Sequence, residues 1–226
     1  FILKTSDISR IRGFDGLRAL AFVLVFVSHK ASSFFSDRYG TLGVWIFFTL
    51  SGFLITRILA ETRRDFEGGR INFKSGLYRF YIRRTARIFP VYYAFLLAVT
   101  ILGACNILEV GSLARQASHW LYLSNVYIEL NGWETRLGHL WSLAVEEQFY
   151  LVFSPLVLAV PLRRLPFVCV AVLVVSAAAH GYFFARDRED IGFAVNSLVN
   201  FSLMGFGGLA GVWADRWTSP DLLGQL

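Results

Sequence analysis

Residues 18–29 read Arg-Ala-Leu-Ala-Phe-Val-Leu-Val-Phe-Val-Ser-His, an almost purely apolar run with an ionisable residue at each end. Arg18 and His29 are eleven positions apart, very nearly three turns of an α-helix, so both lie on one stripe about 16 Å apart along the axis. A histidine within a membrane-length helix must face the protein interior or a wet cavity. The run predicts a membrane helix with a functional pair on one face. A histidine wetted at the helix end is the alternative.

The composition is that of a membrane protein. Of the 226 residues, 55% are hydrophobic and 17% are charged, and the mean hydropathy is +0.52. In a soluble domain about a quarter of the residues are charged. We predict an all-α, polytopic transmembrane helical bundle of about six spans, forming a single domain over residues 1–226. The apolar runs of membrane length lie at 17–35, 41–60, 88–105, 141–160, 165–185 and 192–214.

The cysteines and the first apolar run carry two further expectations. Cys105 and Cys169 both lie in apolar stretches, which favours packing roles over a disulfide framework or a metal motif. We therefore expect no bound metal. The first run lacks the small-residue cleavage site of a signal peptide, so we expect it to be a membrane helix of the protein.

The positive charge is concentrated in one loop. Residues 57–87 contain nine Lys and Arg residues against three acidic ones, a net +6 that equals the net charge of the whole chain. Because basic loops between membrane helices stay in the cytoplasm, we expect this loop inside, together with both ends of the chain. Residues 73–87 mix aromatic rings with arginines and are predicted to form an interfacial helix. Pro90 would then open the third span. We expect no nucleic-acid partner.

The segment 115–140 is predicted not to cross the membrane. Its apolar part, Trp120 to Leu130, is too short to span and contains polar residues. A crossing would place Arg163 and Arg164 outside, whereas a re-entrant or outer-face segment places them inside with the +6 loop, as the charge rule favours.

A second polar group of residues lies in residues 139–150, His-Leu-Trp-Ser-Leu-Ala-Val-Glu-Glu-Gln-Phe-Tyr. Adjacent carboxylates in an apolar helix are costly, which makes Glu146 and Glu147 functional candidates. On a helix Ser142 and Glu146 share one face, and Glu147 and Tyr150 share the adjacent one. His139 would join the Glu146 side if the helix extends that far. Two solvated carboxylates near a helix start are the alternative.

These groups suggest a chemistry. His29 and the glutamates are predicted to lie in the outer half of the membrane, where they could meet. A histidine facing a carboxylate makes a general base. Arg18 and the arginines of 83–87 would face the cytoplasm, and arginine forks suit the phosphates of a nucleotide-like donor. Anchoring of those arginines to anionic lipid is the alternative. The stretch from Gly43 to Phe53 is predicted to pack helices closely around the site.

These segments together resemble the acyltransferase-3 family of integral-membrane acyltransferases. The resemblance covers residues 14–156. The matching blocks are Phe14-Asp15-Gly16-Leu17-Arg18-Ala19-Leu20-Ala21 through His29, Phe47-Phe48-Thr49-Leu50-Ser51-Gly52-Phe53, Phe80-Tyr81-Ile82-Arg83-Arg84-Thr85-Ala86-Arg87-Ile88-Phe89-Pro90, and His139 through Tyr150.

The resemblance implies transfer of an acyl group, usually acetyl, from cytoplasmic acyl-coenzyme A (acyl-CoA) to a hydroxyl of a glycan or lipid-linked sugar across the membrane. It implies no tightly bound cofactor, and a location in the bacterial inner membrane among its lipids. The family domain usually has about ten helices, so helices would be missing after residue 226. The catalytic candidates are His29, Glu146 and Glu147; the donor-binding candidates are Arg18, Arg83, Arg84 and Arg87; the supporting candidates are Asp15, Ser142, His139 and Tyr150.

Two positions depart from the family pattern. Trp45 stands where an acidic or polar residue is common, and Asn200 stands where an arginine is expected, which puts a polar contact from the last span in doubt. Two other classes of function also fit the polar groups. A proton-coupled transporter or lipid-sugar flippase would use the same residues as a relay and an anion site, and a membrane scaffold would use them to lock helices together.

Overall fold

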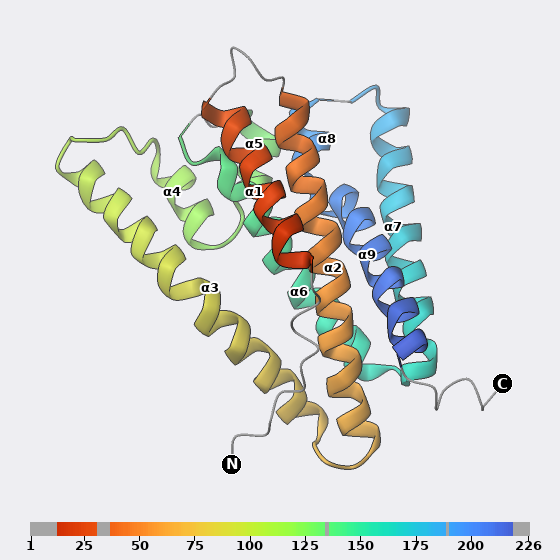
Figure 1. Cartoon of the computed structure of the whole chain (residues 1–226). Coiled ribbons are helices and arrows are strands. Elements are labelled where there is room, and N and C mark those ends of the chain that lie inside the picture. Colours follow the sequence, from red (N-terminus) through yellow and green to blue (C-terminus); the bar gives the residue numbers. More distant parts are fainter. Residues whose placement is uncertain (1–12, 31–36, 134–135, 189, 219–226) are drawn as a thin grey trace. The chain divides into compact units, whose positions relative to one another are not determined.

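The computed structural model describes residues 13–30, 37–133, 136–188 and 190–218, and these residues form helices joined by turns, with no β-strand among them (Figure 1). The all-α prediction is therefore confirmed. The elements in chain order are α1 (Phe14–Lys30), α2 (Asp37–Glu67), α3 (Phe73–Ala104), α4 (Leu113–Trp120), α5 (Ser124–Asn131), the 3-10 turn η2 (Gly138–Leu140), α6 (Trp141–Ala159), the 3-10 turn η3 (Leu162–Arg164), α7 (Leu165–Ala185), α8 (Ile191–Val195) and α9 (Ser197–Thr218).

Five helices of the described part are long and apolar enough to cross a membrane, which makes the chain an integral membrane protein. They correspond to five of the six predicted runs. The remaining run is α1, which the structure describes over 17 residues, and residues 31–36 after it lie outside the described part. The five candidate spans are Arg38–Glu67, Phe73–Ala104, Gly138–Ala159, Leu162–Ala185 and Ser197–Ala214.

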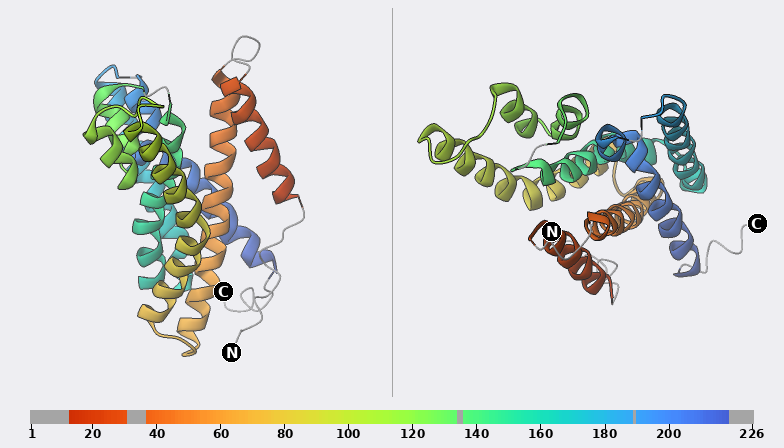
Figure 2. Two further views of the ribbon diagram at one scale, coloured as in Figure 1. Left: turned by 90° about the vertical axis from the view of Figure 1, so that its left-hand side faces the viewer. Right: turned by 90° about the horizontal axis from the view of Figure 1, so that it is seen from above.

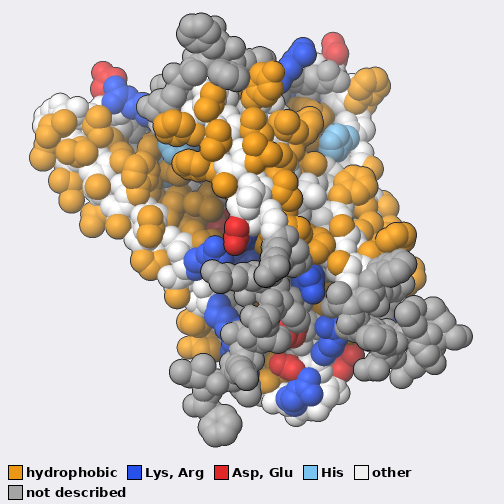
Figure 3. Space-filling view, viewed as in Figure 1, with side chains coloured by type: hydrophobic (Ala, Val, Ile, Leu, Met, Phe, Trp, Pro, Cys, Tyr) orange, Lys and Arg blue, Asp and Glu red, His pale blue; other side chains and the backbone are white. Residues whose placement is uncertain are grey.

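The chain divides into two compact units. Unit 1 consists of residues 1–58 and 203–226, and unit 2 of residues 59–202. In unit 2 the short helices α4, α5 and α8 lie at the end where α3 finishes, and the turn before α3 lies at the opposite end (Figures 1 and 2). Hydrophobic side chains cover the C-terminal half of α3, while basic side chains gather toward its start (Figure 3).

Glycines allow the helices of unit 1 to pack backbone against backbone. A Cβ atom at Gly43 would lie 2.7 Å from the carbonyl oxygen of Ala21 in α1. In the same way, a Cβ atom at Gly52 would strike the backbone of Met204 in α9. Small residues of this kind let membrane helices approach closely. The predicted packing role of the Gly43–Phe53 stretch is therefore confirmed.

Gly207→Ala is expected to destabilise unit 1. The new Cβ atom would lie against the carbonyl oxygen of Thr49 and 2.9 Å from the backbone nitrogen of Phe53, and such overpacking costs about 1–3 kcal/mol. The control is Gly181→Ala in α7, where the space around a new Cβ is open. Both changes gain the same helix propensity, so a lower melting temperature for Gly207→Ala alone would report the close packing. Equal melting temperatures would contradict it.

α3 is one continuous helix of 32 residues with Pro90 inside it. The prediction that residues 73–87 form a separate interfacial helix and that Pro90 opens the next span was therefore wrong. Pro90 lacks an N–H group and cannot bond back to the carbonyl of Ala86, but membrane helices tolerate this loss. At 1.5 Å per residue the helix is about 48 Å long, which exceeds the hydrocarbon core of a bilayer, about 30 Å thick.

The last predicted span, 192–214, is interrupted at Asn196. α8 ends at Val195 and α9 begins at Ser197, because the side-chain oxygen of Asn196 accepts hydrogen bonds from the N–H groups of Leu198 and Val199. This is the geometry of an N-cap. Asn200 is buried, and its amide donates to the carbonyl oxygens of Ala194 and Asn196. It therefore stabilises the break between the two helices.

The segment 115–140 contains two short helices, α4 and α5, of eight residues each. Each is about 12 Å long, too short to cross a bilayer, as the sequence predicted. Ser112 caps α4 by accepting a hydrogen bond from the N–H of Arg115. Gly132, with a positive φ of 88°, ends α5.

We expect Glu134 and Arg163 to lie on opposite faces of the membrane. Only this arrangement places Arg163 and Arg164 with the basic loop. Glu134→Cys and Arg163→Cys, each in a background without Cys105 and Cys169, would be labelled with a membrane-impermeant thiol reagent. The expected result is labelling of the two variants from opposite sides. Labelling of both from the same side would overturn this topology.

Both cysteines are free, but they differ in environment. Cys169 is buried in α7, as predicted. Cys105 is exposed, and the packing role predicted for it was wrong. It follows the last residue of α3 as the C-cap, where its N–H bonds back to the carbonyl of Ile101.

A buried arginine fastens the end of α2 to the end of α6 within unit 2. Arg63 is 8% exposed and donates a hydrogen bond of 2.5 Å to the carbonyl oxygen of Leu158. It also pairs with Glu67 at 3.0 Å, and the Glu67 carboxylate accepts a bond from the N–H of Leu162. These bonds satisfy polar groups at the C-terminus of α6, where a cation is favourable. Together, the contacts of Arg63 and Glu67 hold the turn before α3 against the end of α6.

Candidate active site

The acidic pair lies in the second turn of α6, where both glutamates are half-buried. The hydroxyl group of Tyr150 donates a hydrogen bond of 2.7 Å to Oε1 of Glu146. The two residues are four positions apart and so lie on one side of the helix. The sequence had grouped Tyr150 with Glu147 at a spacing of three, and the structure brings it to Glu146.

Arg84 of α3 lies beside this pair. Its guanidinium carbon is 4.8 Å from the centre of the Tyr150 ring, the geometry of a cation–π contact. The Arg84 cation also attracts the carboxylate of Glu147. The donor-binding candidate of α3 and the acidic pair of α6 therefore belong to one group of side chains within unit 2.

The Tyr150 ring is held firmly in place. Tyr150 is 2% exposed, and its ring packs edge-on against Phe80, with 6.4 Å between centroids. Its backbone carbonyl accepts hydrogen bonds from Ser154 and from Tyr81 of α3. The hydroxyl oxygens of Ser154 and Tyr81 also lie 2.9 Å apart. These contacts fix α3 against α6 at the level of Arg84.

Glu147 points to a different environment from Glu146. Oε1 of Glu147 is buried and has no hydrogen-bond partner within the described part of the chain. Tyr122 is 8% exposed, and its hydroxyl is likewise buried without a hydrogen-bond partner among the described residues. Burial raises the pKa of the Tyr122 phenol above its ordinary value, and the charge of Glu147 raises it further. Unpaired buried polar atoms are uncommon and costly, so this position is a candidate for contact with substrate.

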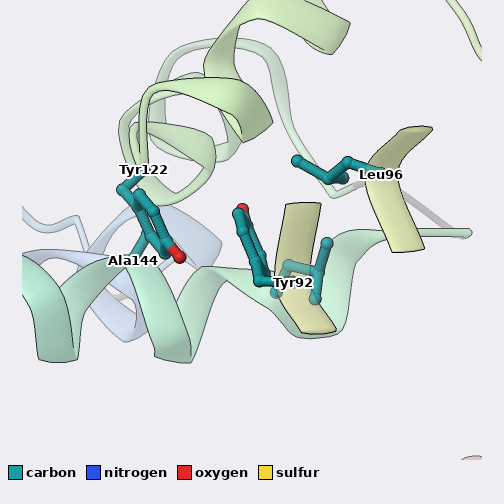
Figure 4. Close-up of a cluster of buried hydrophobic side chains, with 5 residues drawn as sticks. Tyr92, Leu96, Tyr122 and Ala144 are labelled. Atoms are coloured by element: carbon teal, nitrogen blue, oxygen red, sulfur yellow. The ribbon is translucent and has the colours of Figure 1, made fainter. Parts of the chain in front are cut away.

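An aromatic cluster forms one wall beside Glu147. Tyr92 stacks on Tyr122, with 4.4 Å between ring centroids, and both pack near Leu96 and Ala144 (Figure 4). The hydroxyl of Tyr92 donates to the carbonyl oxygen of His119 at 2.7 Å. These contacts attach the turn between α4 and α5 to α3 and α6. Sequence reasoning missed the cluster, because its tyrosines come from segments far apart in the chain.

Gln148 links α6 to α5 and α9 through hydrogen bonds. Its amide nitrogen donates to the carbonyl of Tyr122 at 2.7 Å and to Oδ1 of Asn125 at 2.9 Å, and its Oε1 accepts a hydrogen bond of 2.5 Å from Ser197. Asn125 is 1% exposed and donates to Ser197 as well. A fully bonded network of this kind orients the helices that it joins. The last span therefore does make polar contacts with α6.

The supporting candidates of α6 are arranged differently from the prediction. His139 lies in the turn η2 before α6 and is exposed, so it does not continue the helical face of Glu146. The hydroxyl of Ser142 donates to the carbonyl of His139 at 3.3 Å. Glycine at 138 and a 3-10 turn interrupt the regular helix that the spacing argument assumed.

The three candidate arginines of α3, Arg83, Arg84 and Arg87, divide between two faces. Arg84 is half-buried against Tyr150, whereas Arg83 and Arg87 are exposed. Residues 83 and 87 are four apart and share a stripe of the helix. They are therefore free to meet a ligand or lipid phosphate, and Arg84 is the member that contacts the acidic pair.

Unit 1 holds the remaining candidates. Arg18 lies 3.9 Å from Asp15 on α1, a weak pair with an exposed carboxylate. His29 lies within α1, but its side chain is outside the described residues. The meeting of His29 with a glutamate therefore stays a prediction.

Sequence comparison places the chain among known proteins. The model of the acyltransferase-3 family, described as an acyltransferase domain, matches residues 11–225. The chain belongs to the acyltransferase-3 family. This confirms the resemblance on the four motif blocks, two of which contain the Arg84 and Glu146–Glu147 group of unit 2.

Among curated relatives, the chain is similar to the peptidoglycan O-acetyltransferase OatA of Listeria monocytogenes, with 35% identity over 69% of this chain and 26% of the relative. It is also similar to the O-acetyltransferase OatA of Staphylococcus aureus, with 31% identity over 85% of this chain and 33% of the relative. A putative O-acetyltransferase of Staphylococcus aureus is 30% identical over 89% of this chain and 35% of its own length. The chain thus spans about a quarter to a third of these relatives. No solved structure matches the chain significantly.

Proposed function

We propose that the protein is a membrane O-acyltransferase that moves an acetyl group from acetyl-CoA to a hydroxyl group of a glycan. The observation that supports it most directly is Arg84 beside Glu146 and Glu147, in a chain that belongs to an acyltransferase family. An arginine can bind the phosphates of the donor, and carboxylates can assist proton transfer.

The proposed reaction is a single acyl transfer. The oxygen of the acceptor hydroxyl attacks the thioester carbonyl carbon, a C–O bond forms, the C–S bond breaks, and the coenzyme leaves as a thiolate. The hydroxyl proton passes to a base, for which His29 is our candidate, and from the base to the thiolate. Arg18, Arg83, Arg84 and Arg87 are the candidates for holding the donor phosphates. The donor approaches from the cytoplasm, and the acceptor is modified at the outer face of the inner membrane.

The names of the relatives suggest which acceptor to test first. One of them is a peptidoglycan O-acetyltransferase, so we propose a cell-envelope glycan, with peptidoglycan fragments as the first acceptor. Purified protein would be incubated with labelled acetyl-CoA with and without these fragments. We expect release of free coenzyme to rise when acceptor is added, together with labelled fragments. A proton-coupled transporter would leave the thioester intact, and that result would overturn the proposal.

A further inference from the structure

The two adjacent glutamates of α6 differ in one respect that their sequence does not show. Glu146 has its Oε1 occupied by the hydroxyl of Tyr150, at 2.7 Å. Glu147 has a buried Oε1 for which the described residues provide no hydrogen-bond donor. Consecutive residues of an α-helix point about 100° apart, so one glutamate can be engaged while the other faces a separate environment.

The contacts of Glu146 lead to the arginine of α3. Tyr150 holds Glu146 through its hydroxyl and carries Arg84 over its ring at 4.8 Å. Because Tyr150 is almost fully buried and packs against Phe80, its ring is a fixed platform for the guanidinium group. Loss of the Glu146 carboxylate would remove the acceptor of this hydroxyl and weaken the hold on the Tyr150 ring.

No described residue donates a hydrogen bond to the buried Oε1 of Glu147. Tyr122 packs against the same turn of α6, because Gln148, the residue after Glu147, donates to its backbone carbonyl at 2.7 Å. The buried hydroxyl of Tyr122 likewise lacks a partner among the residues described. The neighbouring Tyr93 donates its hydroxyl to the carbonyl of Trp120 and is therefore engaged. A carboxylate oxygen and a phenol that are both buried and both unpaired form a place where a polar ligand group would gain hydrogen bonds.

We propose that the two glutamates have separate roles, with Glu147 as the carboxylate that acts on the reacting groups and Glu146, through Tyr150, as the positioning residue for Arg84. This inference rests on the proposed acyl transfer. In that reaction the acceptor hydroxyl loses its proton, and a carboxylate with a free oxygen can accept a hydrogen bond from that hydroxyl and orient it. A carboxylate already bonded to Tyr150 is less available for this task.

Glu147→Gln is expected to lower kcat by about 100-fold, the usual contribution of a group that assists proton transfer. It should leave the KM for acetyl-CoA within about threefold of the parent, a change of under 1 kcal/mol. Glutamine keeps the size of the side chain and removes its charge. A matched control is Glu109→Gln, whose side chain is 93% exposed near Arg136 and for which we expect no change in either constant.

Glu146 and Tyr150 are expected to affect donor binding instead. Tyr150→Leu removes both the hydroxyl and the ring beneath Arg84, and should raise the KM for acetyl-CoA about tenfold, or 1.4 kcal/mol. Glu146→Ala should do the same, whereas Glu146→Gln, whose amide oxygen can still accept from Tyr150, should restore most of the affinity. The double variant Glu146→Ala/Tyr150→Leu should have the same KM for acetyl-CoA as Tyr150→Leu alone. Both changes disrupt the same chain of contacts from Glu146 through Tyr150 to Arg84, so their effects should not add.

The assay separates this inference from the proposed function. A parent protein that transfers no acetyl group would overturn the proposed function and the role of Glu147 with it. A parent that transfers acetyl, with Glu146→Gln losing kcat as severely as Glu147→Gln, would overturn the division of roles alone. Should Glu146→Ala fail to accumulate in the membrane, the comparison of the two glutamine variants still decides the result.

Discussion

His29→Ala is expected to abolish acyl transfer, with kcat lower by roughly 1,000-fold, within the range for loss of a general acid–base group. The reason is the position of His29 in an apolar run that the sequence predicts to be a membrane helix, eleven residues from Arg18. An ionisable group there is costly unless it has a function. The measurement is turnover of labelled acetyl-CoA by membranes that contain equal amounts of parent and variant protein.

The matched control is His180→Ala in α7. His180 lies in a candidate membrane span, and its Nδ1 is 2.7 Å from the backbone carbonyl of Ser176 within its own helix. We expect this variant to retain transfer. Unchanged turnover in His29→Ala at normal protein levels would remove His29 from the mechanism.

Arg87→Lys and Arg84→Lys are expected to weaken binding of acetyl-CoA about tenfold each, equivalent to 1.4 kcal/mol. Lysine keeps the positive charge but loses the fork that grips a phosphate at two points. Arg87 is exposed on α3 and would act on the donor directly. Arg84→Lys would in addition lose its planar contact with Tyr150. Equilibrium binding of labelled donor to purified protein is the measurement.

Arg186→Lys provides the control for the arginine variants, because Arg186 follows α7 at the end of unit 2 away from the start of α3 (Figure 1). It should bind the donor as the parent does. If Arg84→Lys and Arg87→Lys also bind donor normally, attachment of α3 to anionic lipid explains these arginines better.

Much of the helical fold could be predicted because the length of an apolar run is a direct requirement of a bilayer. The continuity of α3 could not, since the rule that proline begins a helix describes average propensity. Phe89, which precedes Pro90, and Tyr93, which follows it by three positions, both pack on the aromatic cluster. This packing on both sides of the proline favours an unbroken helix. The pair Asn196–Ser197 did contain a signal for the break before α9, because both residues favour N-cap positions.

The candidate site was predicted in its residue types more successfully than in its geometry. The group of Arg84, Glu146 and Tyr150 could be named from motifs, but spacing alone did not decide which glutamate Tyr150 would bind. Positions three and four apart are both neighbours on a helix, and the choice depends on the side-chain rotamer. Tyr122 and Gln148 were not chosen as site residues, because their roles arise only when α3, α5 and α6 come together.

The central claim is acyl transfer from acetyl-CoA to an envelope glycan, and one measurement tests it most directly. Cells that express the protein would be given labelled acetate, and their envelope glycans would be purified and treated with mild base, which releases O-linked acetyl esters. The account predicts base-labile label on the glycan with the parent protein and only background label with His29→Ala. Equal label in cells with the parent protein, with His29→Ala and with no added protein would contradict it.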